Sequence, residues 1–371
     1  MLEIPTMKRR KAVALFSAAV LTMAFHMEAP AQSSKPLKSV KIALGTQVVN
    51  VTYPWLTLPI ALGYWKSEGY DVKIVTTGGS LQAVQQMMTG SVDFAQLNST
   101  ALIQANVENG VAARGLMGTG VIDWGVGVLP DGPVKSIKDL KGRKIGIFSL
   151  GTGGMPLLKG YLRANGIDPD HDVQIIATGA GAPALEALRS GRVQALMFWG
   201  SALTGFQNAG TPLDILFDPS WRQLPDFTFA TMQKTIDSDP AMVEAIARGA
   251  AKATLFAQSN PECARRIHWK YFPSTKPTGA DEATLAKWDL ALLKTQLEGM
   301  EEAHKMNGGK YIGGMDPAAY GRMEDLMLKD GIIKKKIPAS GMLYLNKDYL
   351  EAINRFDHQA VVEAAKACKG F

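Results

Sequence analysis

Residues 78–98 read Gly-Gly-Ser-Leu-Gln-Ala-Val-Gln-Gln-Met-Met-Thr-Gly-Ser-Val-Asp-Phe-Ala-Gln-Leu-Asn, and they align without a gap on residues 179–199. The aligned pairs include Gly78 with Gly179, Ala83 with Ala184, Met87 with Leu188, Gly90 with Gly191 and Val92 with Val193. The match extends upstream, where residues 59–69 correspond to residues 156–166. A repeat of this kind indicates two structural units built on the same plan.

Each copy has the pattern of strand, helix, strand, helix and strand. The first copy predicts strands at Val40–Leu44, Val72–Val75 and Val92–Leu97 and helices at Thr57–Glu68 and Leu81–Thr89. The second predicts strands at Lys144–Phe148, Val173–Ile176 and Val193–Phe198 and helices at Met155–Asn165 and Ala184–Ser190. Strands separated by helices pair in parallel through right-handed crossovers, so two α/β lobes are expected.

Two extended segments are expected to carry the chain between the lobes. Leu116–Leu129 is a long apolar stretch placed at the first crossing, and Phe227–Met232 is placed at the return. Helices are expected from Pro240, over Asp281–Lys305 and over Pro317–Lys329, and they are expected to cover the first lobe. The expected divisions are a signal peptide at 1–31, lobe 1 at 38–124, lobe 2 at 125–228, and a return to lobe 1 with the C-terminal helices at 229–371.

The composition is that of a water-soluble globular protein. Of the 371 residues, 46% are hydrophobic and 20% are charged, which excludes a disordered chain, a collagen-like chain and a disulfide-dense mini-protein. Removal of residues 1–31 takes away four basic and two acidic groups, so a net charge of +6 becomes +4. Lys334–Lys336 is the single basic run longer than two in the mature part and has no interleaved aromatic residues, so nucleic-acid binding is not expected.

The N-terminal segment has the order of a secretory signal peptide. Lys8–Lys11 are basic, Ala12–Phe25 is an uncharged run of 14 residues, and Ala29-Pro30-Ala31 follows. A helix that spans a bilayer needs about 20 residues, so cleavage after Ala31 is expected instead of a permanent anchor. Translation from Met1 or from Met7 predicts the same mature protein, which is expected in the periplasm.

Two cysteines, Cys263 and Cys368, remain after cleavage. An exported chain reaches an oxidising compartment where such a pair can close into a disulfide. Two separate buried thiols are an equally good reading, because a free cysteine packs well as a small hydrophobe. The sequence leaves both alternatives open.

The loops that follow the strands are the expected ligand site. In an open parallel sheet, ligands bind outside the carboxyl ends of the strands, and these loops combine glycines with hydroxyl or amide side chains. Aromatic residues flank the same strand ends and could form an apolar wall. The expected ligand-binding residues are Gln47, Trp55, Gly79, Ser80, Asn98, Ser99, Trp124, Ser149, Thr152, Gly153 and Trp199. Taken singly, Ser80 or Thr152 could equally be an ordinary helix cap.

The sequence contains no complete catalytic or cofactor-binding motif among those that we considered. Gly179–Ala184 formally fits a dinucleotide-binding pattern, but no acidic residue occurs near position 200 to hold a ribose. Gly151–Gly154 lacks the lysine of a phosphate-binding loop, and there is no nucleophile elbow or zinc-binding helix motif. We therefore expect no catalytic residues, no metal and no cofactor.

Several segments resemble the nitrate, sulfonate and taurine type of ABC-importer solute-binding protein, within the NMT1/THI5-like superfamily. The segments are Val40–Gly45, Ala61–Trp65, Gly90–Ala95, Ser136–Gly146 and Gly191–Ala195. This resemblance covers essentially the whole mature chain, and Ser136–Gly146 is its most specific part. It implies the type II periplasmic-binding-protein fold: two α/β lobes with mostly parallel sheets flanked by helices, joined by two crossings.

The resemblance also implies the function. It implies a periplasmic receptor, monomeric, that delivers its ligand to an inner-membrane permease with a cytoplasmic ATPase. The expected ligand is a small organic anion, a sulfonate or a carboxylate, with an aromatic body among the options, because no arginine lies in the strand-end loops to clamp a compact inorganic anion. Alternatives are a receptor for a pyrimidine precursor of thiamine, a periplasmic sensing module, and a pyrimidine-forming enzyme whose cysteine-rich motif is absent here.

Overall fold

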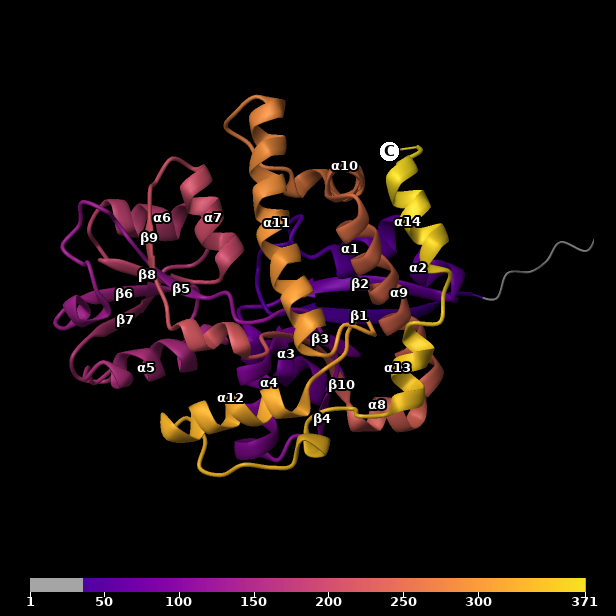
Figure 1. The fold of residues 1–371 in the computed structure, drawn as a ribbon, viewed down its shortest axis with the longest axis horizontal. Helices are drawn as coiled ribbons and strands as arrows, with labels where there is room; N and C mark the ends of the chain where they lie inside the picture. Colours follow the sequence, from indigo (N-terminus) through magenta and orange to yellow (C-terminus); the bar gives the residue numbers. More distant parts are fainter. Residues whose placement is uncertain (1–35, 371) are drawn as a thin grey trace, which may run out of the picture. The chain divides into compact units, whose positions relative to one another are not determined.

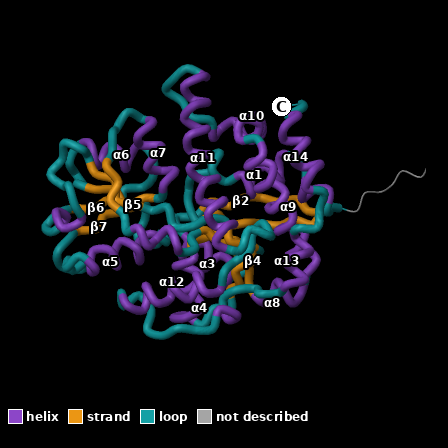
Figure 2. Tube along the Cα trace, in the orientation of Figure 1, coloured by secondary structure: helices purple, strands orange, loops and turns teal. Residues whose placement is uncertain are grey.

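The computed structural model describes residues 36–370, and the expected signal peptide lies outside the described residues. From Leu37 onward the chain forms one unit that contains all the elements described below. Its strands form two separate five-stranded sheets (Figure 1 and Figure 2). We call each sheet, together with the helices that pack on it, a lobe.

The first sheet contains the three strands of the first repeat copy. Its members are β1 (Lys38–Leu44), β2 (Tyr70–Thr76), β3 (Phe94–Asn98), β4 (Ala113–Gly118) and β10 (Phe227–Met232). The order is β2-β1-β3-β10-β4, and β1 pairs in parallel with both β2 and β3. Strand β10 lies antiparallel between β3 and β4, with Phe227 opposite Asn98. The expected boundary at residue 228 therefore falls inside this strand, because pairing with β3 already begins at Phe227.

The second sheet repeats this plan. Its members are β5 (Gly125–Val128), β6 (Lys144–Ile147), β7 (Gln174–Ala177), β8 (Ala195–Phe198) and β9 (Asp214–Leu216). The order is β7-β6-β8-β5-β9, with β6 parallel to β7 and β8, and with β5 antiparallel to β8 and β9. In each sheet the antiparallel strand directly follows a passage from the other sheet. The predicted mostly parallel sheets and the two crossings are confirmed.

Helices flank both sheets. In chain order they are α1 (Pro54–Ala61), α2 (Tyr64–Ser67), α3 (Ser80–Met88), α4 (Ser99–Asn109), α5 (Gly154–Ala164), α6 (Ala182–Arg189), α7 (Gly200–Asn208), α8 (Gln233–Ser238), α9 (Pro240–Ser259), α10 (Pro261–Tyr271), α11 (Glu282–Met306), α12 (Pro317–Lys329), α13 (Lys347–Ile353) and α14 (His358–Ala367). The single helix predicted over Thr57–Glu68 is wrong. It is divided into α1 and α2 by Gly63, whose φ of 71° is left-handed and ends the first helix. No described helix is both long and apolar enough to span a membrane.

The C-terminal helices cover the first lobe and also reach the second. Helix α9 packs on α1, and α13 and α14 pack on α9. A disulfide joins Cys263 of α10 to Cys368, which directly follows α14, so the disulfide reading is the right one. Helix α11 contacts α10 of the first lobe and α7 of the second, and α12 contacts α4 and α5. The expectation that these helices cover the first lobe alone is therefore incomplete.

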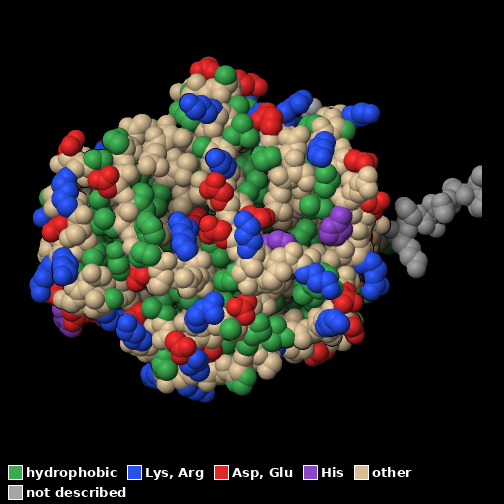
Figure 3. Space-filling view, in the orientation of Figure 1, with side chains coloured by type: hydrophobic (Ala, Val, Ile, Leu, Met, Phe, Trp, Pro, Cys, Tyr) green, Lys and Arg blue, Asp and Glu red, His purple; other side chains and the backbone are tan. Residues whose placement is uncertain are grey.

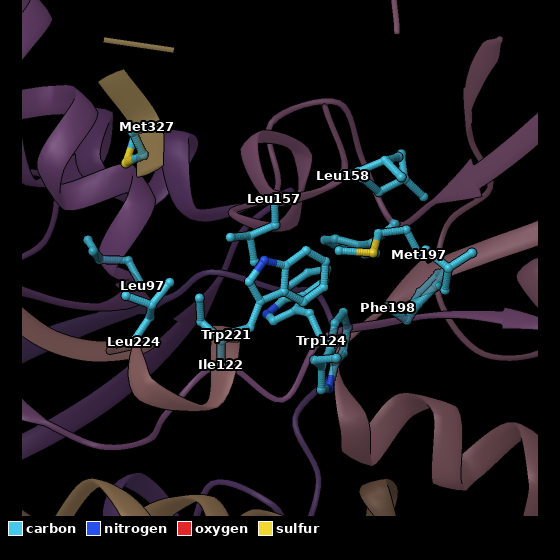
Figure 4. Packing of buried hydrophobic residues seen from close by; sticks show 14 of the residues in the cluster. Leu97, Ile122, Trp124, Leu157, Leu158, Met197, Phe198, Trp221, Leu224 and Met327 are labelled. Carbon is cyan, nitrogen blue, oxygen red and sulfur yellow. The ribbon is translucent and has the colours of Figure 1, made fainter. Parts of the chain in front are cut away.

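One apolar core continues from the first lobe into the second. Figure 4 shows Leu97 of β3 and Leu157 of α5 in the same group of side chains as Ile122, Trp124 and Trp221, and all five belong to one cluster of buried side chains. A second cluster, on the other face of the first sheet, includes Trp55 and Phe256. The two lobes are therefore joined by packed side chains as well as by the chain crossings.

Most charged side chains of the described residues lie at the surface. On the face drawn in Figure 3, lysine and arginine are interspersed with aspartate and glutamate. This face presents mixed charge over both lobes, which would attract neither a strong polyanion nor a strong polycation.

Candidate functional site

The loops at the carboxyl ends of the parallel strands meet between the lobes. The Leu81 amide, in the first turn of α3, donates to the Gly151 carbonyl at 3.3 Å. The Thr100 hydroxyl, in the first turn of α4, donates to the Gly153 carbonyl at 2.8 Å. These bonds join loops that follow β2 and β3 to the loop that follows β6. The lobes are in contact at their strand ends.

A small cavity lies at this contact. It is lined by Leu44, Gly45, Thr46, Tyr53, Ser80, Gln96, Leu97, Asn98, Trp124, Thr152, Trp199 and Phe227. We call it the inner cavity. Its volume is about 10 Å³, which is room for a single water molecule. The described lining contains hydroxyl and amide groups but no lysine, arginine or histidine.

A hydrogen-bond chain runs from the inner cavity to the crossings. The Ser80 hydroxyl donates to Asn98 Oδ1 at 2.9 Å and accepts from the Asn98 amide at 3.1 Å. The Asn98 Nδ2 donates to Asp226 Oδ1, and Trp124 Nε1 donates to Asp226 Oδ2 at 2.9 Å. This chain links the end of β3, the first crossing and the start of β10. Ser80 and Asn98 are therefore also structural residues.

Two buried carboxyl groups lie at the crossings. Asp226 is 2% exposed, and its burial, together with the charge of Asp123, raises its pKa to about 8 against the opposing effect of its bonds with Asn98 and Trp124. Asp123 is 9% exposed, and burial raises its pKa to about 6, while a hydrogen bond from the Gly200 backbone and the Arg222 charge act in the opposite direction. Sequence reasoning missed Asp226 as a functional candidate. Its position directly before the returning strand was the available signal.

Three of the expected site residues lie away from the inner cavity. Trp55 is fully buried in the first-lobe core, where its Nε1 donates to Gln96 Oε1 at 2.7 Å. The Ser99 hydroxyl donates to the Pro225 carbonyl at 2.6 Å and so binds the second crossing. Gln47 is exposed and lines none of the described cavities. The structure does not bring these side chains into one site.

The expected glycines lie where the lobes approach most closely. A Cβ atom on Gly79 would lie 2.8 Å from the Gly151 carbonyl oxygen and 2.9 Å from the Ser149 hydroxyl. A Cβ on Gly153 would collide with the Asn98 side chain. Both positions therefore need glycine for contact between the loops. The Ser149 hydroxyl is buried and has no hydrogen-bond partner among the described residues.

The remaining expected residues line the contact. Thr152 is 5% exposed and lines both the inner cavity and a second cavity, of about 300 Å³, whose lining includes Lys159 and Arg163. Trp124 and Trp199 meet edge to face, with ring centroids 5.7 Å apart. The structure therefore brings together Gly79, Ser80, Asn98, Trp124, Ser149, Thr152, Gly153 and Trp199.

A much larger cavity lies on the other side of Trp199, which lines both. It is lined by Val48, Asn50, Ala180, Gly181, Ala182, Pro183, Leu185, Glu186, Arg189, Trp199, Ser201, Ala202, Gly205, Phe206, Ala209 and Leu292. We call it the outer cavity. Its volume is about 730 Å³, within the range of small-molecule sites. Gly179–Gly181 and Trp199–Ser201 both follow strands of the second copy, so the sequence places these two loops at the expected strand-end site. Of the lining residues, only Trp199 is among the expected ligand-binding residues.

The chain is similar to several proteins of known structure. It is 24% identical to a protein from Bordetella bronchiseptica RB50, with a TM-score of 0.67 over 85% of this chain and 96% of that one. It is 16% identical to the periplasmic aliphatic sulphonate binding protein SsuA from Escherichia coli, with a TM-score of 0.57 over 84% and 93% of the two chains. It is 14% identical to the periplasmic nitrate-binding protein NrtA from Synechocystis PCC 6803, with a TM-score of 0.53 over 90% and 89%. These likenesses show the periplasmic-binding-protein fold.

A match by sequence identifies the family. No curated protein matches the chain. The family model described as NMT1/THI5 like matches residues 56–264, which is more than half of the chain and includes the aligned parts of both repeat copies, 59–98 and 156–199. The protein therefore belongs to the NMT1/THI5-like family.

Proposed function

We propose that this protein is the periplasmic solute-binding receptor of an ABC importer and that it binds a small organic anion, a sulfonate or a carboxylate, between its lobes. The observation that carries the proposal is the meeting of the two sheets at the carboxyl ends of their parallel strands, beside two cavities. Ligands of open α/β sheets bind at such ends. The structural neighbours named as sulphonate-binding and nitrate-binding proteins support the same reading.

Lobe motion is the mechanism that we propose. The chain passes between the sheets from β4 to β5 and from β9 to β10, so each crossing can act as a hinge. A ligand that touches both lobes stabilises their closed arrangement in proportion to its differential affinity for that arrangement. An inner-membrane permease with its cytoplasmic ATPase would then recognise the closed monomer. The lobe boundaries expected from the sequence remain part of this proposal.

The chemistry of the strand-end loops supports an organic ligand over a compact inorganic anion. A nitrate-sized anion bound in a closed site gains most from bidentate or charge-assisted donors such as arginine. The described lining of the inner cavity contains hydroxyl, amide and apolar side chains and no cationic one. We therefore propose that backbone amides and hydroxyls bind the acid group and that apolar side chains pack on the rest of the molecule. Binding without chemical conversion is the proposed role.

The test is a binding screen on the purified mature protein, residues 32–371. Melting temperature is measured with sulfonates, aliphatic and aromatic carboxylates, nitrate and pyrimidines, and any ligand found is then followed by small-angle X-ray scattering. A ligand at 100 times its dissociation constant adds about 2.7 kcal/mol to the free energy of unfolding. We expect one class to raise the melting temperature and to lower the radius of gyration. Absence of binding in every class, from folded protein free of co-purified ligand, would overturn the proposal.

A further inference from the structure

The outer cavity has the size and the walls of a site for an apolar body. Trp199, Leu185, Phe206 and Leu292 contribute large apolar side chains to its lining. Its volume of about 730 Å³ far exceeds the room for one water in the inner cavity. A ligand without a sizeable apolar group would leave these walls without contacts, and it would gain little from their burial.

One polar group in this lining lacks a partner. Ser201 is 1% exposed, lies in the first turn of α7, and its hydroxyl has no hydrogen-bond partner among the residues that the structure describes. Buried hydroxyls are normally paired, because an unpaired one costs about 1–3 kcal/mol. A ligand that lies in the outer cavity could satisfy this hydroxyl.

The helix ends around this hydroxyl favour an acceptor on the ligand. Helices α6 and α7 both begin at the outer cavity, and neither has a side-chain cap at its N-terminus. The Gly200 amide of α7 already donates to Asp123, and the other unpaired amides of the two first turns add a partial positive charge at the outer cavity. The guanidinium of Arg189 is already engaged, because its Nε donates to the Thr211 hydroxyl at 2.7 Å and its Nη2 to the Ala209 carbonyl at 2.8 Å. The Ser201 hydroxyl is then a buried donor of this lining without a partner among the described residues, and rotation of its side chain can turn it towards an acid oxygen.

We propose that the outer cavity selects ring-bearing organic acids, with the ring packed on the apolar walls and one acid oxygen accepting a hydrogen bond from Ser201. This inference rests on the proposed function and narrows its ligand class. Trp199 and the α7 N-terminus, more than the loops around Ser80 and Thr152, then determine specificity. Acids of the size of nitrate or acetate are excluded as the main ligands.

The experiment compares pairs of acids that share a head group and differ in the ring. Dissociation constants are measured by isothermal titration calorimetry on residues 32–371 for benzenesulfonate against methanesulfonate, and for benzoate against acetate. Burial of the ring removes apolar area from water. We therefore expect the dissociation constant of each ring-bearing acid to be lower by about tenfold or more. Equal constants within both pairs would overturn the inference and leave the receptor role intact. No binding by any probe or by any class in the broader screen would overturn both.

Two variants test whether the ligand binds in the outer cavity. Ser201→Ala is expected to weaken benzenesulfonate binding by about tenfold, and Ala202→Phe, which fills the cavity, by at least as much. Ala318→Phe is the matched control, because Ala318 is exposed on α12 and lines none of the described cavities. Melting of each empty variant checks folding, and Ser201→Ala keeps the test valid if the larger side chain is not tolerated. Ring-selective binding that neither variant weakens would overturn the assignment to the outer cavity.

Discussion

At the scale of single residues, the crossings between the lobes contain two carboxyl groups that are buried and have raised pKa values. Asp123 and Asp226 are both buried, and the positive charge of Arg222 acts on both carboxyl groups. Asp226 is bound by Asn98 and Trp124, whereas Asp123 Oδ1 has no hydrogen-bond partner within the described part of the chain. An acid beside the N-terminus of α7 opposes the anion that we place there.

Replacement of Asp123 should therefore strengthen anion binding in a pH-dependent way. Its pKa of about 6 means that the carboxyl is mostly ionised at pH 7.5 and mostly protonated at pH 5. Asp123→Asn should lower the dissociation constant of benzenesulfonate severalfold at pH 7.5, with little effect at pH 5, because benzenesulfonate stays ionised throughout. Calorimetry at the two pH values is the measurement. Asp131→Asn removes the same charge from an exposed loop, and an equal effect there would contradict the local explanation.

His268 gives a second prediction, on stability. It is buried in the first lobe, its Nε2 lies 2.7 Å from the Thr275 hydroxyl, and burial lowers its pKa to about 4. The folded state favours the neutral ring. The contribution of this preference to the free energy of unfolding is complete above the unfolded pKa of about 6.5, and it is lost as the pH falls towards 4. Chemical denaturation should show a loss of up to about 3 kcal/mol across this window.

The variants separate this effect from other titrations. His268→Gln should lower stability at pH 8 but flatten its dependence on pH between 6.5 and 4. The exposed His358→Gln should keep the wild-type profile. A wild-type profile in His268→Gln would show that other groups cause the acid dependence.

At the scale of elements, the loop after β2 sets how closely the lobes approach. Gly79 has a φ of 151°, which lies at the edge of the left-handed region, and its missing Cβ makes room for the Gly151 carbonyl. Gly79→Ala should hold the loops apart, weaken benzenesulfonate binding by roughly tenfold or more and raise the radius of gyration in solution. Gly321→Ala is the control. Gly321 lies in α12 with open space around it, and alanine there should leave binding unchanged and stabilise the helix by roughly 0.5–1 kcal/mol. Unchanged binding in Gly79→Ala would contradict the proposed closure.

Elements with a clear hydrophobic period, or with residues that typically begin or end a helix, could be predicted from the sequence. The strand at Phe227–Met232 and the helix at Pro317–Lys329 have the predicted bounds. Helix α4 was not predicted as an element, because most of its residues are buried and it shows no separate polar face. The strand-end loops were also predictable, but the cavity that holds an organic ligand was not. Its volume depends on the distance of α11 from α6 and α7, and α11 lies far from both helices in the sequence.

At the scale of the whole molecule, the lobes share more than two hinges. Helix α11 joins them through a bond from Asn208 Nδ2 to the Trp288 carbonyl and a bond from the Val121 amide to the Gly299 carbonyl. One buried apolar cluster also extends into both lobes. If the two lobes move apart, these contacts must rearrange or α11 must move together with one lobe.

This continuity predicts cooperative unfolding. Differential scanning calorimetry of residues 32–371 should show one transition, with calorimetric and van't Hoff enthalpies that agree, because one buried apolar cluster extends through both lobes. Ser201→Ala, which lies outside the shared cluster, should preserve the single transition. Two resolved transitions in the wild-type protein would show that the lobes unfold independently.

The strand order affects how the chain folds during its synthesis, which starts at the N-terminus. Strand β4 is complete by residue 118, but its neighbours in the sheet are β10, which begins at Phe227, and the segment around Leu343. For the synthesis of more than a hundred residues, β4 therefore has no main-chain partner from its own sheet. A nascent first lobe cannot close early, and its unpaired strand is exposed to aggregation and to chaperones during this interval.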